Sequence, residues 1–208
     1  ENDKRIELKD NVLEVEYGKG TYSQDLIHSK AIDFLDKQDN DVPFFLFYPT
    51  IIPHAELIVP EDSIIKKFRG KFPEKPYKGE EPGNRAFRKG GYCTQFYPHA
   101  TFAAMIYRLD VYVGQIVQKL KEKGLYDNTI IIFSSDNGPH MEGGADPDFF
   151  NSNSIWRGYK RDLYEGGIRV PMIIAWPGHV STNSETNFMC SFWDVMPTFE
   201  EVLNPKAD

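Results

Sequence analysis

TIIIFSSDNG, residues 129–138, is the stretch of sequence that decides the fold. Residues 129–133 are apolar and mostly β-branched, which favours a strand buried inside a sheet. The residues that follow are small or polar, and Asp-Asn-Gly is a favourable turn sequence. The stretch therefore predicts a buried strand that ends in a polar turn at residues 134–138.

Two amphipathic helices are predicted on the N-terminal side of this strand. Between Phe102 and Leu120, apolar residues recur at intervals of three and four, and Gly124 supplies a stop. A shorter helix with the same periodicity begins at Ser23, a candidate N-cap, and ends near Lys37. We expect the apolar face of the shorter helix to pack on a sheet.

Other segments complete the predicted sheet and its cover. Residues 43–48 form a continuous apolar run, typical of a central parallel strand covered on both faces, and residues 170–176 predict another buried strand. A final helix is expected within residues 192–203, and residues 12–17 alternate weakly, as in a short edge strand. Because helices and strands alternate, the sequence predicts an α/β fold with a mainly parallel sheet between helices.

Residues 53–100 form a long excursion within this pattern. They contain six prolines and five glycines and therefore resist any regular element. Excursions of this length are usually binding loops or disordered segments, and the sequence leaves both alternatives open. The length of 208 residues and the hydrophobic content of 40% predict one domain with a real core over residues 1–208.

Charge and apolar content exclude several classes of protein. A net charge of −7 disfavours binding to nucleic acid or to an anionic lipid surface. The longest mainly apolar stretch, residues 44–52, is interrupted by a proline and is much shorter than the roughly 20 residues that a membrane helix needs. Cys93 and Cys190 are too few for a disulfide framework, and we interpret them as ordinary thiols.

Some polar residues follow predicted strands or lie between glycines, where ligands approach the backbone most easily. Asp136 and Asn137 offer hard oxygen donors that suit Ca²⁺ or Mg²⁺, although the same residues suit a plain turn. His54 follows the strand predicted at residues 43–48 and either donates a proton, binds an anion or is an ordinary surface histidine. Lys160 lies between glycines that allow close approach of a ligand, or it is simply solvated.

The loop between the turn and Lys160 contains candidates for carbohydrate binding. His140 and three nearby acidic residues have side chains suited to hydrogen bonds with sugar hydroxyls, and a solvated charged loop explains them equally well. The aromatic residues Phe149, Phe150 and Trp156 either form a platform for a sugar ring or anchor the loop. The acidic residues are Glu142, Asp146 and Asp148.

Three stretches in this region resemble the later signature regions of type I sulfatases, a family of the alkaline-phosphatase-like superfamily. They are SDNGP at 135–139, GYK at 158–160 and EGGIRVP at 165–171. Supporting similarity covers nearly the whole chain, through FFLF at 44–47 with Pro53-His54, Leu109-Asp110, and FWDVMPT at 192–198. The resemblance implies the C-terminal portion of a sulfatase catalytic domain, with an α/β sandwich that is incomplete in this chain.

The resemblance also implies a role for each matching residue. Asp136 and Asn137 are expected to bind a divalent cation, usually Ca²⁺ and alternatively Mg²⁺, that polarises the sulfate oxygens. Lys160 is expected to neutralise charge on the sulfuryl group, and His54 to bind the sulfate and assist departure of the alcohol. Other charged residues match family positions that we interpret as architectural: Asp110, Glu165, Arg169 and Asp194.

The chain departs from the family pattern at the nucleophile. Type I sulfatases convert a cysteine or serine in the motif C/S-x-P-x-R into formylglycine, whose hydrate attacks sulfur. Cys93 is followed by Thr-Gln-Phe and Cys190 by Ser-Phe-Trp, so neither fits, and the family's early aspartate pair has no match either. We therefore expect formylglycine in an N-terminal remainder of the same protein, a partner without which this chain should not turn over substrate.

Two alternative functions stay open at the level of sequence. A phosphate-ester hydrolase of the same superfamily generally uses zinc or manganese, and the pattern around Lys160 suits it poorly. A non-catalytic binding module would keep the sulfatase shape without a nucleophile. The preferred hypothesis is a sulfatase acting on a sulfated small molecule or glycan, and on a carbohydrate sulfate in particular. Export to a periplasm, lysosome or extracellular space is what the family suggests, not what this sequence shows.

Overall fold

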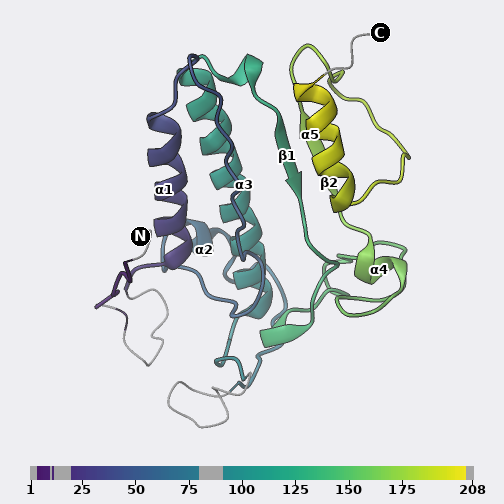
Figure 1. The fold of residues 1–208 in the computed structure, drawn as a ribbon. Coiled ribbons are helices and arrows are strands. Elements are labelled where there is room, and N and C mark those ends of the chain that lie inside the picture. The colour runs from purple at the N-terminus through teal and green to yellow at the C-terminus, as the bar shows by residue number, and fades with distance from the viewer. Residues whose placement is uncertain (1–3, 10, 12–19, 80–90, 205–208) are drawn as a thin grey trace.

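The computed structural model of the chain describes residues 4–9, 11, 20–79 and 91–204 (Figure 1). The elements, in chain order, are α1 (Ser23–Asp36), α2 (Ser63–Phe68), α3 (Pro98–Glu122), β1 (Ile131–Ser134), α4 (Glu165–Ile168), β2 (Met172–Ala175) and α5 (Val195–Leu203). Short 3-10 helices lie at Tyr126–Asn128, Glu142–Gly144 and Phe192–Asp194. The edge strand predicted at residues 12–17 lies outside the described residues.

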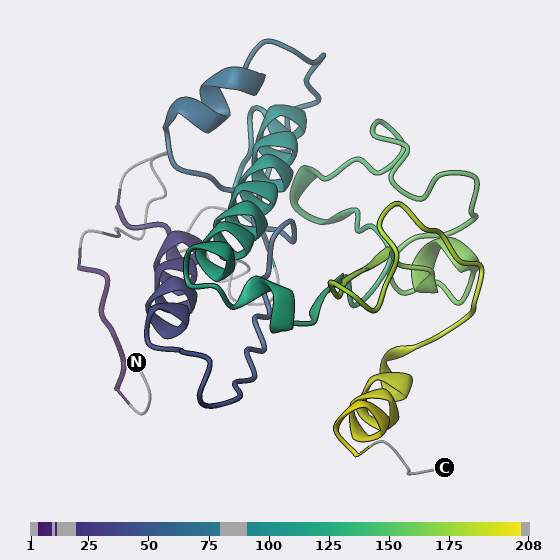
Figure 2. The ribbon, with the colours of Figure 1, turned by 90° about the horizontal axis from the view of Figure 1, so that it is seen from above.

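Helices α1 and α3 lie side by side and form a helical layer (Figure 1, Figure 2). Pro98 stands in the first turn of α3, where a missing N–H leaves no hydrogen bond unmade, and Gly124 follows the helix with a φ of +66°. Both helices were predicted from the spacing of apolar residues. The predicted cap is wrong by one residue, because Ser23 is the first helical residue of α1 and Tyr22 is its N-cap.

The apolar core lies between α3 and the part of the Pro/Gly-rich excursion that precedes it. Its buried members are Ile52, Leu57, Val59, Ile65, Ala100, Ala104, Met105 and Tyr112. The excursion is held further by an isolated β-bridge between Tyr77 and Gln95, and the Gln95 amide donates to the Leu57 carbonyl at 2.6 Å. In its described parts the excursion is therefore ordered and packed on α3, and the expectation that it resists any regular element is wrong, because α2 lies within it.

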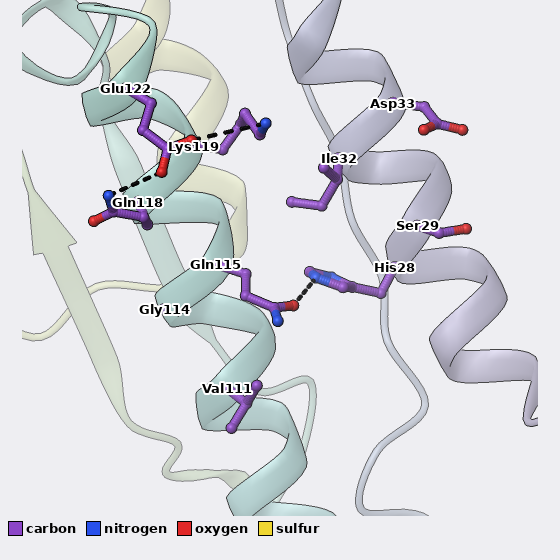
Figure 3. A pocket seen from close by; sticks show the side chains of 10 residues that line it. All are labelled: His28, Ser29, Ile32, Asp33, Val111, Gly114, Gln115, Gln118, Lys119 and Glu122. Carbon is purple, nitrogen blue, oxygen red and sulfur yellow. Dashed lines mark hydrogen bonds and ion pairs between the residues drawn. The ribbon is translucent and has the colours of Figure 1, made fainter.

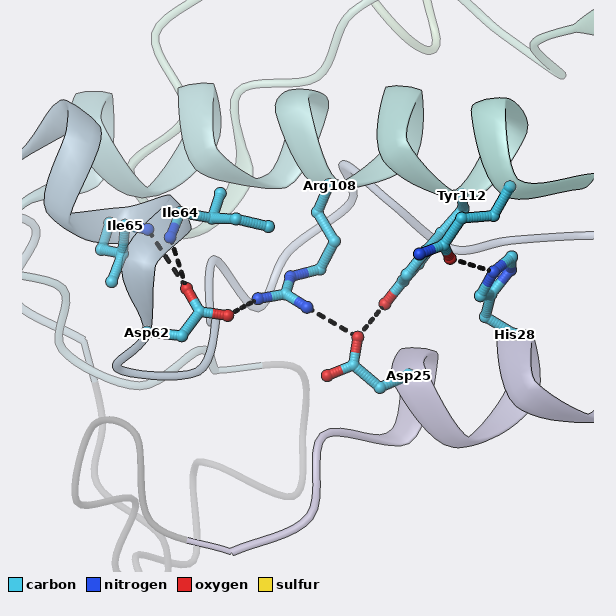
Figure 4. Close-up of polar contacts among 8 residues, drawn as sticks. Asp25, His28, Asp62, Ile64, Ile65, Arg108 and Tyr112 are labelled. Atoms are coloured by element: carbon cyan, nitrogen blue, oxygen red, sulfur yellow. Dashed lines mark hydrogen bonds and ion pairs between the residues drawn. The ribbon is translucent and has the colours of Figure 1, made fainter. Parts of the chain in front are cut away.

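An ionic network centred on the buried Arg108 joins α1, α2 and α3 (Figure 4). The Arg108 guanidinium of α3 donates to Asp25 of α1, with Nη1 to Oδ1 at 2.7 Å, and also to Asp62. Asp62 is in addition the N-cap of α2, because its carboxylate accepts from the backbone N–H of Ile64 at 2.8 Å. Burial, and then the hydroxyl's hydrogen bond to Asp25, raise the pKa of Tyr112. A buried charge with paired, hydrogen-bonded partners avoids most of the desolvation penalty, so the network fixes how the helices pack.

Strands β1 and β2 pair antiparallel, with Ile131 opposite Ala175 and Ser134 opposite Met172. Both strands were predicted, but two expectations about them are wrong for the described residues. The strands are not parallel, and neither is buried, since three of the four β2 residues are exposed. A parallel pair needs a crossover connection, usually a full helix. The connection here, residues 135–171, is described throughout, and α4 is its single short α-helix, so the chain simply reverses. The end of β1 therefore lies beside the start of β2.

Residues 43–48 form an extended segment instead of the predicted central strand. Phe44 and Leu46 pack against the apolar cluster at one end of α1 and α3, whereas Phe45 is 74% exposed and Phe47 is 76% exposed. This alternation has the period of a β-strand. No strand in the described part of the chain pairs with the segment, so only one of its faces is covered, rather than the two expected.

Helix α5 lies on the side of the sheet opposite α3 (Figure 1, Figure 2). Its Phe199 ring meets Phe45 edge to face, with 6.5 Å between the centroids. The two helical layers with strands between them form an incomplete α/β sandwich, as predicted. Among the described residues, no helix combines the length and the apolar character that crossing a membrane requires.

Candidate functional site

Three loops that lie far apart in the sequence meet just beyond the end of β1. The turn at residues 136–140 lies between the other two. On one side, the Pro139 carbonyl accepts from the backbone N–H of Lys160 at 2.8 Å. On the other side, Nε2 of His140 lies 3.0 Å from the Pro53 carbonyl oxygen. These contacts bring together the loops that carry the predicted site residues, and we call this region the loop junction.

Glycines allow the turn and the Lys160 loop to approach so closely. The N–H of Gly138 donates to the Gly167 carbonyl at 2.9 Å. A Cβ on Gly138 would lie 1.9 Å from the Gly166 carbonyl oxygen, and a Cβ on Gly166 would lie 2.1 Å from that of Gly158. No other residue type fits at such backbone contacts, which explains the glycines that flank Lys160 in the sequence.

Asp136 and Asn137 present oxygen atoms at the junction. The Asn137 amide donates to Oδ1 of Asp136 at 2.8 Å, which leaves the amide oxygen and the second carboxylate oxygen without a hydrogen bond to the described residues. These hard donors fit Ca²⁺ or Mg²⁺, but two side chains are too few to hold either ion. No group of three or more His, Cys, Asp or Glu side chains suited to a metal occurs in the described part of the chain. The described residues therefore do not form a complete metal site by themselves.

One ring nitrogen of His54 makes a hydrogen bond within the chain, and the other is available for a ligand. The ring is half buried, and Nδ1 lies 2.7 Å from the Ala55 carbonyl oxygen. Because a carbonyl oxygen only accepts, Nδ1 carries the proton of this hydrogen bond. Nε2 is then the ring nitrogen left to donate a hydrogen bond to an anion or a proton to a leaving group.

Lys160 is held through its backbone, and its ammonium group makes no ion pair with the described residues. Its charge is close enough to His140 to contribute to lowering the pKa of that ring. The next residue, Arg161, has a left-handed backbone with a φ of +81°, and its guanidinium pairs with Glu142. The two neighbouring cations thus differ: Arg161 is paired with a carboxylate of the same chain, and Lys160 has no such partner among the described residues.

His140 differs from the other candidates because it is 7% exposed. Its Nε2 donates to the Pro53 carbonyl, and its Nδ1 accepts from the Glu142 N–H at 3.2 Å. Burial lowers the pKa of His140, although the Pro53 hydrogen bond and the Glu142 charge act to raise it. Burial favours the neutral ring, whereas the Glu142 carboxylate, with Oε2 3.0 Å from Nδ1, favours the charged one, and the lowered pKa means that burial has the larger effect. A sugar contact through His140 would need a ring nitrogen that these hydrogen bonds do not leave free.

The aromatic residues of the same loop anchor it on α3. The Phe149 ring stacks on His99, with 3.8 Å between centroids and 5° between planes, and the Phe150 ring lies 5.4 Å from Phe102. Trp156 is half buried below the Arg169 guanidinium, which lies 4.1 Å from its ring centroid. Of the two interpretations given to these rings, the contacts favour the anchor over the sugar platform.

A hollow of about 580 Å³ lies elsewhere, between α1 and α3 (Figure 3). Its walls are helix-surface side chains, some of which already pair with each other, such as His28 with Gln115 at 2.7 Å. None of the residues predicted to bind or cleave a substrate lines it. We therefore place the candidate site at the loop junction.

Sequence reasoning missed the contacts that tie the junction together. The Glu142–Arg161 pair joins residues 19 positions apart, and the His140–Pro53 contact spans 87 positions. No spacing rule connects residues at such separations. The glycines on either side of Lys160 were the one local signal. They indicated that two backbone segments approach closely, but they did not identify the second segment.

The fold class is the α/β alkaline-phosphatase-like class that was expected. The chain superposes on the crystal structure of Ps i-CgsB in complex with k-i-k-neocarrahexaose with a TM-score of 0.69 and 31% sequence identity, covering 90% of this chain and 35% of that one. The family model described as Sulfatase matches residues 2–204. The chain therefore belongs to the sulfatase family, and the resemblance to type I sulfatases is confirmed.

Two curated relatives show how much of a sulfatase this chain represents. It is 37% identical to steryl-sulfatase of Rattus norvegicus over 102 residues, which is 48% of this chain and 18% of that protein. It is 25% identical to N-acetylgalactosamine-6-sulfatase of Homo sapiens over 181 residues, which is 86% of this chain and 28% of that protein. The chain thus spans less than a third of either relative.

Proposed function

We propose that this chain is part of a sulfuric ester hydrolase whose substrates are carbohydrate sulfates. One observation carries the proposal: in a chain of the sulfatase family, hydrogen bonds at the loop junction hold together the loops of a histidine, two oxygen donors and a lysine without an ion pair to the described residues. Gripping a tetrahedral anion and expelling an alcohol requires these kinds of groups.

Each residue of the proposed site acts on a defined atom. The Lys160 ammonium lies against the sulfate oxygens and offsets the charge that builds up as the ester bond breaks. Nδ1 of His54 stays on the Ala55 carbonyl, while protonated Nε2 donates its proton to the departing alcohol oxygen. The nucleophile, a formylglycine, comes from an N-terminal remainder of the same protein.

Asp136 and Asn137 hold a divalent cation in this proposal, with the remaining ligands supplied by the N-terminal remainder. The cation, when bound, polarises the sulfate oxygens. Two of their oxygens, which no hydrogen bond from the described residues reaches, support this role. A set of oxygens contributed by separate segments suits the flexible coordination of Ca²⁺ better than the strict octahedron of Mg²⁺.

The N-terminal remainder is also the proposed partner for the uncovered faces of the chain. The side chains of Phe45 and Phe47 are 74% and 76% exposed, and Met196 on α5 is 73% exposed. Large exposed apolar surfaces usually mark places where another part of a protein packs. A chain that spans 18% and 28% of its relatives leaves ample sequence for such a partner.

The sugar substrate class is supported by two of the similar proteins. One is named for N-acetylgalactosamine and aligns with 86% of this chain, and the other is bound to neocarrahexaose and covers 90% of it. The relative named for steryl sulfates aligns with only 48% of the chain. The broader alignment favours a sugar over a sterol.

The test uses a polypeptide that contains this chain together with the proposed remainder. Lys160→Ala should lower the release of sulfate from 4-nitrophenyl sulfate by about 10²- to 10³-fold, because the developing charge loses its counterion. Lys37→Ala, a matched change at an exposed lysine at the end of α1, should leave turnover within about twofold. Unchanged turnover in the Lys160 variant, or faster hydrolysis of 4-nitrophenyl phosphate than of the sulfate, would contradict the proposal.

A further inference from the structure

The residue next to the proposed catalytic histidine in space has no capacity left for a substrate. Nε2 of His140 is used by the Pro53 carbonyl, Nδ1 is used by the Glu142 N–H, and the side chain is 93% shielded from solvent, since it is 7% exposed. A ring in this state acts only through the groups that it touches. The contacts of His140 therefore determine its role.

The face of the His140 ring lies on the face of the His54 ring. The centroids are 5.0 Å apart and the planes are inclined by 17°. The Pro53 carbonyl that His140 binds belongs to the residue directly before His54. One side chain thus contacts both the ring of His54 and the peptide unit that leads into it, while the Ala55 carbonyl holds Nδ1 of His54 from the other side.

Glu142 connects His140 to the loop that carries Lys160. The backbone N–H of Glu142 anchors His140, and the Glu142 carboxylate pairs with Arg161, the residue after Lys160. Burial alone would raise the pKa of Glu142, but the hydrogen bond and charge of Arg161 bring it below its ordinary value, so the carboxylate is ionised. Residues 140–142 therefore form a brace between the loops that carry His54 and Lys160.

We propose that His140 is a positioning residue, which fixes the ring plane of His54 so that Nδ1 stays on the Ala55 carbonyl, and which does not touch the substrate. The inference rests on the proposed function for its catalytic meaning, because His54 is the acid of that proposal. Its structural content does not depend on any reaction: the stack on His140 holds the His54 ring where the Ala55 carbonyl selects a single tautomer.

The structural content is tested in the 208-residue chain by long-range ¹H–¹⁵N NMR of the histidine rings above pH 8. The wild-type chain should show His54 with its proton on Nδ1 and His140 with its proton on Nε2. His140→Ala removes the ring and both hydrogen bonds, and His140→Phe keeps a flat ring without the nitrogens. A shift of His54 towards a mixture of tautomers in either variant supports the proposal.

The control is His179→Gln, which alters an exposed histidine whose ring packs on Trp176 and should leave His54 unchanged. If His140→Ala does not fold, His140→Phe still gives a decisive result. His54 signals that stay at their wild-type positions in every folded His140 variant overturn the proposal. This result would say nothing against sulfate ester hydrolysis, so the two failures are distinguishable.

The catalytic meaning is tested by steady-state kinetics with 4-nitrophenyl sulfate in the polypeptide that includes the proposed remainder. His140→Phe should lower kcat by about tenfold or more while KM stays within about twofold, because a misplaced acid affects only the transition state. A raised KM at unchanged kcat would overturn the proposal and make His140 a substrate contact. An inactive wild-type polypeptide would instead count against the proposed function.

Discussion

The helical layer and the sheet region of this molecule are built in opposite ways. Helix α3 has nine buried residues, including the charged Arg108, whereas α5, which the structure describes in full, has none. Ile173 on β2 is likewise 62% exposed. The helical layer completes its own core, while the sheet region keeps apolar side chains at its surface. The loop junction lies between these two regions. The candidate site is therefore at the boundary between the helical layer, which has its own core, and the sheet region, whose apolar side chains are exposed.

The largest expected effect on the helical layer is a loss of stability when its ionic network is removed. Arg108→Ala leaves the Asp25 and Asp62 carboxylates without their shared cation and should lower the free energy of unfolding by about 3 kcal/mol. This is the low end for a buried pair, because the side chains of the two aspartates are 43% and 35% exposed. Urea denaturation followed by circular dichroism measures the change.

The control for this variant is Arg69→Ala, which breaks a surface pair with Glu61 at 2.6 Å. Its effect should stay below about 1 kcal/mol, as for other exposed ion pairs. Equal losses in both variants would mean that the Arg108 network does not hold the helical layer together.

A pair of glycine substitutions sharpens the contrast between the helix and the junction. Gly138→Ala places a Cβ 1.9 Å from the Gly166 carbonyl oxygen and should destabilise the chain by about 1 to 3 kcal/mol. Gly114→Ala, inside α3, meets no atom within 4 Å and should stabilise it by about 0.5 to 1 kcal/mol. Thermal melts of the two variants should therefore shift in opposite directions, and shifts of the same sign would refute the close approach at the junction.

The smallest expected effect is a pH dependence that belongs to the helical layer. Burial lowers the pKa of His28, against its hydrogen bond with Gln115 and the charge of Asp25. The buried Nδ1 has no hydrogen-bond partner among the described residues, so protonation would bury an N–H without an acceptor. Since the unfolded chain takes up the proton at its ordinary pKa of 6.5, stability is complete above that pH and is lost as the pH falls through the lowered value.

Urea denaturation at several pH values measures this effect. The slope due to one histidine cannot exceed about 1.4 kcal/mol per pH unit. His28→Gln should reduce the slope without removing it, because burial also lowers the pKa of His140. A slope that is identical in the variant would show that His28 titrates in the folded chain as it does in the unfolded one.

The features that sequence could predict are those that depend on neighbours along the chain. The helices α1 and α3 follow from the spacing of their apolar residues, and β1 with its turn follows from the TIIIFSSDNG stretch. The antiparallel partner of β1 could not be predicted, because it depends on the course of residues 135–171. The same holds for the single covered face of residues 43–48, where local hydrophobicity gives the period but not the neighbours.

The candidate site shows the same division. Asp136, Asn137, His54 and Lys160 were selected because their types and their places after strands or between glycines suit a metal and an anion. His140 was selected because its side chain suits hydrogen bonds with sugar hydroxyls, yet its ring is used by Pro53, 87 residues away. A residue type that suits a substrate says nothing about whether its polar atoms are already used, and only the folded chain supplies that information.

In the proposed site, Asp136 and Lys160 act on the same anion, Asp136 through the cation that it helps to hold and Lys160 directly. A double-mutant cycle tests this claim directly, by measuring kcat/KM for 4-nitrophenyl sulfate with Asp136→Ala, Lys160→Ala and both changes in the polypeptide that includes the proposed remainder. If the two residues serve one site, the double variant should be about as impaired as the worse single variant. Losses that multiply in the double variant, as for two independent sites, would contradict the account.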